Sequence, residues 1–319
     1  NREILKGDSK DMFADKKSRL DAYMRRKEGL ELGITTGFEE LDYISLGIKP
    51  SDLWAFIGYT GVGKSQLLII IACALRRAGY KPLLITKEMQ PDQLIMRADA
   101  IWSGLDLEKF SEGKLLQDQE EKFIEFINDD TDADSSFPIE LATGGVSSIT
   151  ALIEKHSPDV CLVDGAYLMT GDTDSKDWNK YVDTFRDFKA ITTSLKTPII
   201  VTMQSKENNS AKGLDNIAFA KYIAQDCSAV WGMEKIVEDC TNYTTMKITS
   251  FKQRDSGRFG SCTYNWCFRK MDWTLDHYNI PGYDEYLLTK AKEKREASKK
   301  KVKDNAPVVT KKLLFRKGK

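Results

Sequence analysis

Eight consecutive residues carry the clearest chemistry in this sequence. Residues 58–65, G-Y-T-G-V-G-K-S, match the phosphate-binding pattern G-x-x-x-x-G-K-[ST] at every fixed position. An apolar run of strand length at 52–57 precedes them, and an apolar run of helix length at 66–77 follows. Glycine backbone approaches a ligand closely, and a helix that begins after such a loop points its N–H groups at phosphate oxygens. The sequence therefore predicts that the chain binds a nucleoside triphosphate.

The residues of this loop are expected to bind both the phosphates and the metal ion. We assign the nucleotide contacts to Gly58, Thr60, Gly61, Val62, Gly63, Lys64 and Ser65. In this pattern the lysine, here Lys64, reaches the β- and γ-phosphates, and the hydroxyl of Ser65 ligates Mg²⁺. Lys64 and Ser65 are therefore a predicted catalytic residue and a predicted metal ligand.

Polar residues that end the apolar strands are further site candidates, because ligands of open α/β sheets bind at the carboxyl ends of the strands. Asp164 ends a strongly apolar run, and its carboxylate would hold Mg²⁺ opposite Ser65 or, alternatively, cap a turn. Glu88 follows another strand, where it would activate the attacking water or serve as an ordinary acid at a helix entry. Gln204 ends a third apolar strand, where its side-chain amide would sense the γ-phosphate.

Two cations, Lys252 and Arg254, lie just past a later strand and point the same way by alternation. Such a pair could clamp phosphate charge, and an arginine supplied by a neighbouring subunit contributes about 10³–10⁵ in rate. Surface cations beside Asp255 are an equally good interpretation of the spacing alone.

Apolar runs of strand length alternate with segments of helix length along the chain. We expect strands at 52–57, 82–86, 138–141, 160–163, 199–203, 229–233, 244–251, 263–268 and 273–276. We expect helices at 10–27, 66–77, 91–102 and 147–156, within 37–52 and 112–136, and from 290 into a disordered tail. This alternation predicts an α/β fold with a mostly parallel sheet, helices on both faces and an antiparallel extension at one edge.

Composition excludes several classes of protein. The six cysteines, at 73, 161, 227, 240, 262 and 267, form no C-x-x-C pair, and several lie in apolar runs. We interpret them as buried thiols in a reducing compartment. Only two histidines are present, and they lie far apart at 156 and 277, so we do not expect a Cys/His metal site. No apolar run approaches membrane-spanning length and no signal peptide opens the chain, so we expect a soluble cytoplasmic protein with no membrane partner.

The net charge of zero hides an asymmetry between the two ends of the chain. Residues 290–319 hold 13 Lys and Arg against 3 Asp and Glu, which leaves 35 against 45 for residues 1–289. An acidic body argues against a broad nucleic-acid-binding outer surface. If the chain binds a polyanion, the positive charge that contacts it must therefore be local, in loops or in the tail.

Several blocks of sequence, in order, give the chain a family resemblance. It resembles the DnaB-type replicative helicases, the RecA-like ring ATPases of superfamily 4, over roughly residues 34–268. The matching blocks are T-G-F-E-E-L-D at 36–42, the phosphate-binding loop, T-K-E-M-Q-P-D-Q-L-I-M-R at 86–97, Asp164 with Gln204, I-A-Q-D at 223–226 and F-K-Q-R-D-S-G at 251–257.

The resemblance implies roles that the residues alone leave open. It makes Glu88 the catalytic glutamate, adds Arg97 to the nucleotide contacts, and makes Asp164 and Gln204 the Mg²⁺ acid and the sensor. Lys252 and Arg254 become cations that act on the neighbouring subunit's nucleotide. The family's pore-loop block has no clear equivalent here; its positions fall near 218–221, and Lys206, Lys212 and Lys221 are the DNA-contact candidates.

We therefore expect an ATP- and Mg²⁺-dependent helicase motor that threads single-stranded DNA through a homo-hexameric ring, with primase, a helicase loader or other replisome proteins as candidate partners. Residues 1–33 would form a tail and linker helix that docks on the neighbouring subunit, 34–289 the RecA-like ATPase domain and 290–319 a basic disordered tail. The alternative for the helix at 10–27 is that it packs on the body of its own chain. If a phage encodes the chain, it works in the host cytoplasm. The alternatives are a RecA-like recombinase filament and a regulatory ring ATPase that acts on protein partners.

Overall fold

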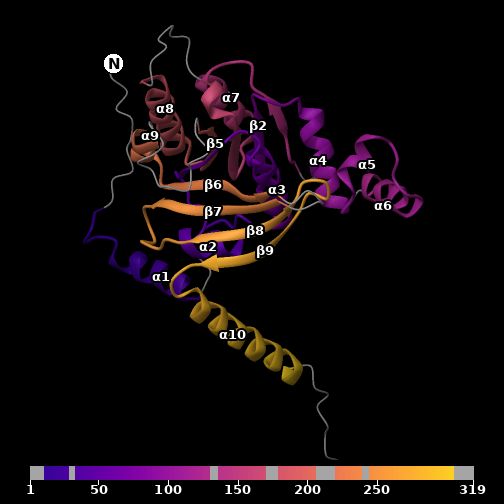
Figure 1. Ribbon diagram of the computed structural model, residues 1–319. Coiled ribbons are helices and arrows are strands. Elements are labelled where there is room, and N and C mark those ends of the chain that lie inside the picture. Colours follow the sequence, from indigo (N-terminus) through magenta and orange to yellow (C-terminus); the bar gives the residue numbers. More distant parts are fainter. Residues whose placement is uncertain are drawn as a thin grey trace, which may run out of the picture. The chain divides into compact units, whose positions relative to one another are not determined.

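A computed structural model describes residues 11–28, 33–129, 136–169, 179–205, 220–238 and 244–304. The chain divides into two compact units, Asn1–Ile280 and Pro281–Lys319. The first is built on a nine-stranded sheet of order β3-β2-β4-β5-β1-β6-β7-β8-β9 (Figure 1). Its strands are β1 Leu53–Gly58, β2 Pro82–Thr86, β3 Ile139–Leu141, β4 Val160–Asp164, β5 Ile199–Gln204, β6 Ala229–Glu238, β7 Thr244–Gln253, β8 Ser261–Cys267 and β9 Asp272–Asn279.

The sheet confirms the predicted fold class. From β3 to β6 neighbouring strands pair in parallel, and from β6 to β9 they pair antiparallel. The parallel strands β1, β2 and β4 are buried along their whole length, whereas β7 alternates between buried and half-buried residues. This contrast follows from the layers, because a parallel sheet is covered on both faces and an antiparallel extension on one.

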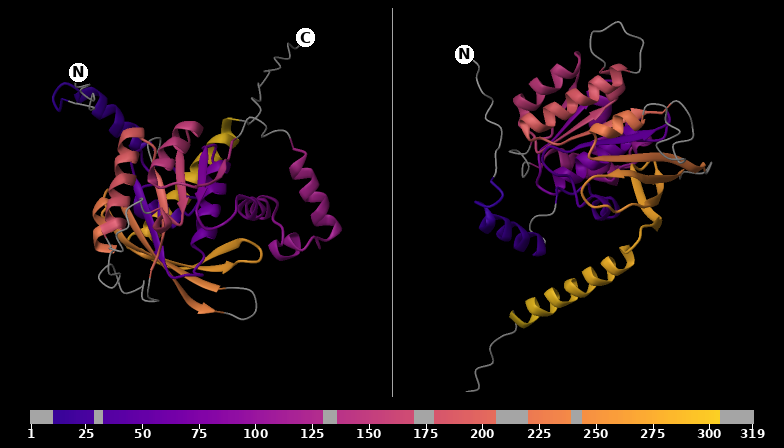
Figure 2. Two further views of the ribbon diagram at one scale, coloured as in Figure 1. Left: turned by 90° about the horizontal axis from the view of Figure 1, so that it is seen from above. Right: turned by 90° about the vertical axis from the view of Figure 1, so that its left-hand side faces the viewer.

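Helices cover both faces of the parallel part. Helices α7 (Val146–His156), α8 (Asn179–Leu195) and α9 (Ala220–Asp226) contribute Ile149, Phe185 and Ile223 to one core with alternate residues of β1, β2, β4 and β5. Figure 1 shows these three helices on one side of the sheet. Helix α3 (Lys64–Arg77) contacts β1, β2 and β4 but shares no residue with that core, so it packs on the opposite face. Figure 2 gives two further views of this layering.

The remaining helices connect or precede these layers. They are α1 (Lys16–Lys27), α2 (Glu39–Ser45), α4 (Pro91–Ser103), α5 (Leu107–Ser111), α6 (Gln117–Ile127) and, in the second unit, α10 (Tyr283–Asp304). Of these helices, the sequence predicted α4 to within one residue and placed α2 and α6 inside longer predicted segments. Helix α10 begins earlier than the expected residue 290, since Pro281 and Gly282 end the preceding segment.

Helices α5, α8 and α9 are absent from the predictions. Helix α8 is mostly polar, yet its buried Val182, Phe185, Phe188 and Ile191 recur every third residue, which is the helical signal. Helix α1 starts at Lys16 rather than residue 10, because the Asp11 carboxylate accepts hydrogen bonds from the backbone N–H groups of Phe13 and Ala14 and closes a turn instead.

Candidate nucleotide-binding site

The phosphate-binding loop has the backbone that its pattern requires. It leads from the end of β1 into α3, and Gly63 caps the helix in the left-handed region at φ 86°. A Cβ at Gly63 would lie 2.9 Å from a ring atom of Phe268, and one at Gly58 would lie 2.9 Å from the carbonyl oxygen of Met233. Glycine is therefore needed at both positions for space, and at Gly63 for conformation as well.

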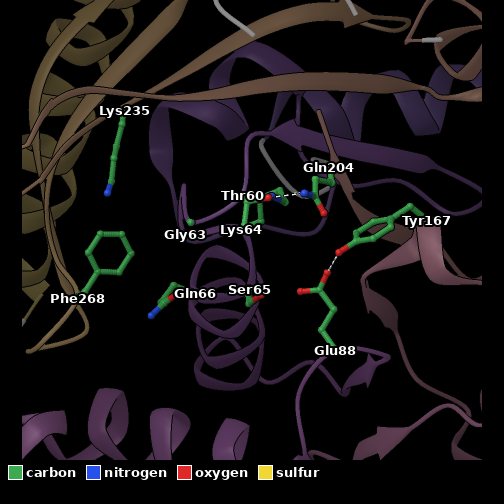
Figure 3. Close-up of a pocket in the computed structure, with 11 residues that line it drawn as sticks. Thr60, Gly63, Lys64, Ser65, Gln66, Glu88, Tyr167, Gln204, Lys235 and Phe268 are labelled. Atoms are coloured by element: carbon green, nitrogen blue, oxygen red, sulfur yellow. Dashed lines mark hydrogen bonds between the residues drawn. The ribbon is translucent and has the colours of Figure 1, made fainter. Parts of the chain in front are cut away.

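The loop opens into a pocket of about 360 Å³. Its lining residues are Thr60, Gly61, Gly63, Lys64, Ser65, Gln66, Glu88, Tyr167, Gln204, Lys235 and Phe268 (Figure 3). Seven of these were expected from the sequence, and they come from three strand ends that are far apart in the chain. Gly58, Val62 and Asp164, also expected, do not line the pocket, and the side chains of Val62 and Asp164 are buried.

Lys64 lies over the loop that carries it. Its ammonium donates to the carbonyl oxygens of Gly58 at 3.0 Å and Tyr59 at 2.8 Å. Burial lowers the pKa of Lys64, while the nearby carboxylates of Glu88 and Asp164 act in the opposite direction. A cation held at this point faces both acids and the pocket, as phosphate binding requires.

The end of β4 presents a buried acid, Asp164, which is the predicted metal ligand. Asp164 is buried, and its Oδ1 accepts a hydrogen bond from the Thr202 hydroxyl at 2.7 Å. Its Oδ2 is buried with no hydrogen-bond partner within the described part of the chain. A buried carboxylate oxygen with no partner costs free energy unless a cation or water satisfies it. Together with the Ser65 hydroxyl on the pocket wall, this oxygen fits Mg²⁺, which takes few protein oxygens and completes its shell with phosphates and water.

Glu88 is the residue predicted to act as the general base. It stands on the pocket wall after β2, and burial together with the Asp164 charge raises the pKa of its carboxyl, which Lys64 partly offsets. Its backbone N–H donates to the Thr86 hydroxyl at 3.2 Å. The Tyr167 hydroxyl donates to its Oε1. A carboxylate on the pocket wall near a lysine can take a proton from water in the pocket.

Gln204 links the next strand to the loop. It pairs with Gly58 in the β1–β5 register, and its amide donates to the Thr60 hydroxyl. The N–H of Ser205 donates to the Gly58 carbonyl at 2.9 Å. Two hydrogen bonds therefore join the end of β5 to the phosphate-binding loop, so a movement of one would displace the other.

Lys252 and Arg254 lie at the other end of the sheet. Gln253 pairs with Ala229, which pairs with Trp54 at the start of β1, whereas the phosphate-binding loop follows the end of that strand. Four residues of strand separate the two ends, about 13 Å at ~3.3 Å per residue. The Lys252 ammonium donates to the carbonyls of Ala224 and Gln225 at the end of α9. Burial and then the adjacent Arg254 lower the pKa of Lys252, which agrees with the expectation that the two cations lie together.

The other expected residues have varied positions. Arg97 donates to the Met89 sulfur at 3.2 Å and interacts electrostatically with Asp164, but it does not line the pocket. Lys206 and Lys212 lie outside the described residues, and Lys221 belongs to α9 without a described side chain. The five cysteines of the described part, Cys73, Cys161, Cys227, Cys262 and Cys267, are free and buried, as expected; Cys240 lies outside it.

Sequence reasoning missed several residues of the site. Figure 3 shows Phe268 and Lys235 across the loop from Glu88 and Tyr167. Tyr167 lies three residues after Asp164, in a segment already assigned to the site, and this proximity could have identified it as a site residue. Phe268 and Lys235 enter from the antiparallel extension, and only the sheet order brings them to the loop.

No helix within the described residues is long and apolar enough to span a membrane. Nor do those residues contain a cluster of three or more His, Cys, Asp or Glu side chains that could hold a metal ion.

Known proteins resemble this chain over the same region. Residues 33–260 match the family model of the DnaB-like helicase C-terminal domain. The replicative DNA helicase DnaB of Helicobacter pylori is 24% identical over 245 residues, which cover 71% of this chain and 50% of that protein. The chain thus spans about half the length of the curated relatives that match it along most of its length.

Two solved structures share the fold. One is an ATPase domain that superimposes with a TM-score of 0.71 and is 16% identical in sequence. The superposition covers 84% of this chain and 100% of that domain. The other, a DnaB-like replicative helicase solved in a study of its interactions with primase, gives a TM-score of 0.69 at 16% identity, with 84% of this chain and 67% of that one covered.

Proposed function

The chain belongs to the DnaB-like helicase C-terminal domain family, and we propose that it is the ATP-driven motor of a replicative helicase. In this proposal a homo-hexameric ring of the chain translocates on single-stranded DNA and unwinds duplex. The observation that best supports it is the separation of the site into two parts at opposite ends of one sheet: the pocket and the Lys252/Arg254 pair.

Within one chain, the pocket supplies binding and water activation. Lys64 and the N–H groups of the phosphate-binding loop hold the β- and γ-phosphates. Ser65 and Asp164 would hold Mg²⁺, which would neutralise phosphate charge there. Glu88 accepts the proton of the attacking water, and Gln204 reports the γ-phosphate to the segment that follows β5. Arg97 supports this acidic group from α4.

The second part of the site acts on another copy of the chain. Lys252 and Arg254 lie about 13 Å along the strands from their own loop, beyond the reach of contact with its phosphates. In a ring of subunits packed side by side, each subunit would present these cations to the γ-phosphate bound by the next subunit. Hydrolysis then requires an interface, which couples it to assembly.

The remaining contacts of the ring are proposed from charge and exposure. Lys206, Lys212 and Lys221 would face DNA in the pore, where local positive charge suffices despite an acidic body. Helix α1 has no buried residue and exposes Leu20, Tyr23 and Met24, which suits docking of residues 1–33 on the neighbouring subunit. Residues 34–289 would form the ATPase domain and 290–319 a separate basic segment. A primase, a loader or other replisome proteins are the partners we propose.

Three measurements on the purified chain test this function. ATP hydrolysis is measured with and without single-stranded oligonucleotide, and particles with a non-hydrolysable ATP analogue are imaged by negative-stain electron microscopy. We expect stimulated hydrolysis and closed rings, followed by strand displacement on a forked duplex. Stimulation with open filaments would instead indicate a recombinase-like protein. Rings that neither bind oligonucleotide nor respond to it would indicate a regulatory ATPase.

A further inference from the structure

Tyr167 is the one aromatic hydroxyl on the described wall of the pocket, and it touches the proposed general base directly. Tyr167 belongs to the short 3₁₀ helix Ala166–Leu168 that follows β4, and its hydroxyl donates to Glu88 Oε1. Both side chains line the same pocket. Figure 3 shows the contact, with the other carboxylate oxygen of Glu88 directed toward the side of Ser65.

The backbone beneath this contact is held firmly. Gly165 adopts φ 80°, which turns the chain after β4, and its N–H donates to the Thr202 hydroxyl at 2.9 Å. Ala166 and Met169, on either side of Tyr167, are fully buried in the core. The tyrosine therefore projects from a fixed turn into the pocket.

The glutamate side of the contact is tied to the same turn. The N–H of Lys87 donates to the Asp164 carbonyl at 3.2 Å, so the segment after β2 is bonded to the end of β4. A Cβ at Gly165 would lie 3.1 Å from Glu88 Cγ, which means that the glutamate stem packs on the glycine. Because the two backbones are joined, the hydroxyl and the carboxylate meet at a defined place.

We propose that Tyr167 is a positioning residue that orients the Glu88 carboxylate toward the attacking water, an inference that rests on the function proposed above. A carboxylate on a flexible stem can rotate, and only the orientation that aims a free oxygen at water is productive. A donor bound to Oε1 restricts this rotation and leaves the second oxygen for the proton. The arrangement is a base held by a third group, as in other activated sites.

The same hydrogen bond acts on proton affinity. Burial and Asp164 raise the pKa of the Glu88 carboxyl, whereas a hydroxyl that donates to the carboxylate favours its charged form. Loss of the hydroxyl therefore raises the pKa of Glu88 further. The base is then protonated over a wider acidic range, and the acidic limb of the rate profile moves to higher pH.

The test is Tyr167→Phe, which removes only the hydroxyl. We expect kcat for ATP hydrolysis to fall about tenfold, part of the ~10²–10⁴ that a general base contributes. We expect KM for ATP to change less than about twofold and the acidic limb of kcat to move to higher pH. Tyr80→Phe, in the turn that precedes β2 at the opposite end of that strand, is the matched control and should leave both unchanged.

A double variant separates positioning from other roles. In a Glu88→Gln background, Tyr167→Phe should cause no further loss, because the group it orients is already absent. An equal tenfold loss in both backgrounds would overturn the proposal, since Tyr167 would then act on something other than Glu88. Wild-type kcat and pH profile in Tyr167→Phe would also overturn it, while leaving the proposed ATPase function intact.

A measurement that does not depend on turnover keeps the two hypotheses distinct. The pKa of the Glu88 carboxyl can be followed by ¹³C NMR on labelled protein, in the wild type and in Tyr167→Phe. We expect a higher pKa in the variant even if the chain hydrolyses no ATP and the proposed function fails. An unchanged pKa would mean that the hydroxyl does not bind the carboxylate in solution, which would contradict the proposal.

Discussion

The two ends of the parallel strands carry two different kinds of site. At the carboxyl end, Lys64, Glu88 and Gln204 converge on one pocket within a single chain. At the amino end, Lys252 and Arg254 gather beside α9, about 13 Å along the strands from that pocket. The first site brings together the groups proposed to bind the nucleotide, whereas the second holds two cations away from it. We infer from this contrast that hydrolysis is a property of two copies in contact.

The largest effect is expected from Arg254→Ala. If the amino end acts on a neighbour's nucleotide, the variant should bind ATP and form rings normally but hydrolyse about 10³–10⁵-fold more slowly. Hydrolysis and nucleotide affinity are measured on the same preparation. Arg186→Ala, which removes an exposed arginine of α8, is the control. Weaker ATP binding by the isolated Arg254→Ala chain would mean that Arg254 contacts the nucleotide bound by its own chain. That result would contradict the assignment of this arginine to the neighbouring subunit's site.

Lys64→Ala probes the carboxyl end. The change removes the cation that faces Glu88 and Asp164, so we expect hydrolysis to fall about 10³-fold, the upper range for loss of one transition-state donor. Unlike Arg254→Ala, it should also weaken ATP binding by the single chain. Equilibrium binding of a fluorescent ATP analogue measures this, with Lys81→Ala as a distant control. Normal turnover would show that this loop is not the working site.

Thr202→Val tests how the pocket holds its metal ligand. The Thr202 hydroxyl binds Asp164 Oδ1 and the Gly165 N–H, and valine keeps its shape. Since such supporting bonds are worth about 10–100-fold in metal affinity, the Mg²⁺ concentration for half-maximal hydrolysis should rise by that factor. Thr197→Val, at the amino end of β5, should have no such effect. Unchanged Mg²⁺ dependence would mean that Asp164 is not the ligand.

The smallest effect is expected from Lys252→Met. Its ammonium is already bound by carbonyls at the end of α9, where a cation stabilises a helix by about 0.3–1 kcal/mol. We expect a slightly lower free energy of unfolding in urea and a smaller loss of kcat than for Arg254→Ala. A loss as large as that of Arg254→Ala, with unchanged stability, would mean that Lys252 leaves α9 to act beside the arginine.

The same two ends explain what the sequence could predict. Continuous apolar runs and their polar ends identified β1, β2, β4 and β5, and with them Glu88, Asp164 and Gln204, because parallel strands must bring those ends together. Tyr167 and Thr202 were missed since their roles depend on partners 79 and 38 residues away in the chain. Phe268 reaches the loop only through the order of four antiparallel strands, which no local pattern encodes.

Mixing two inactive variants shows whether the site is shared between subunits. A subunit with Arg254→Ala keeps its own pocket, and one with Glu88→Gln keeps its cations, so a mixed ring contains interfaces with both parts intact. We predict that mixing the two inactive proteins restores ATP hydrolysis well above either alone, while mixing the double variant Arg254→Ala/Glu88→Gln with either single variant does not. Mixed rings with no more activity than their parents would contradict a site shared between two subunits.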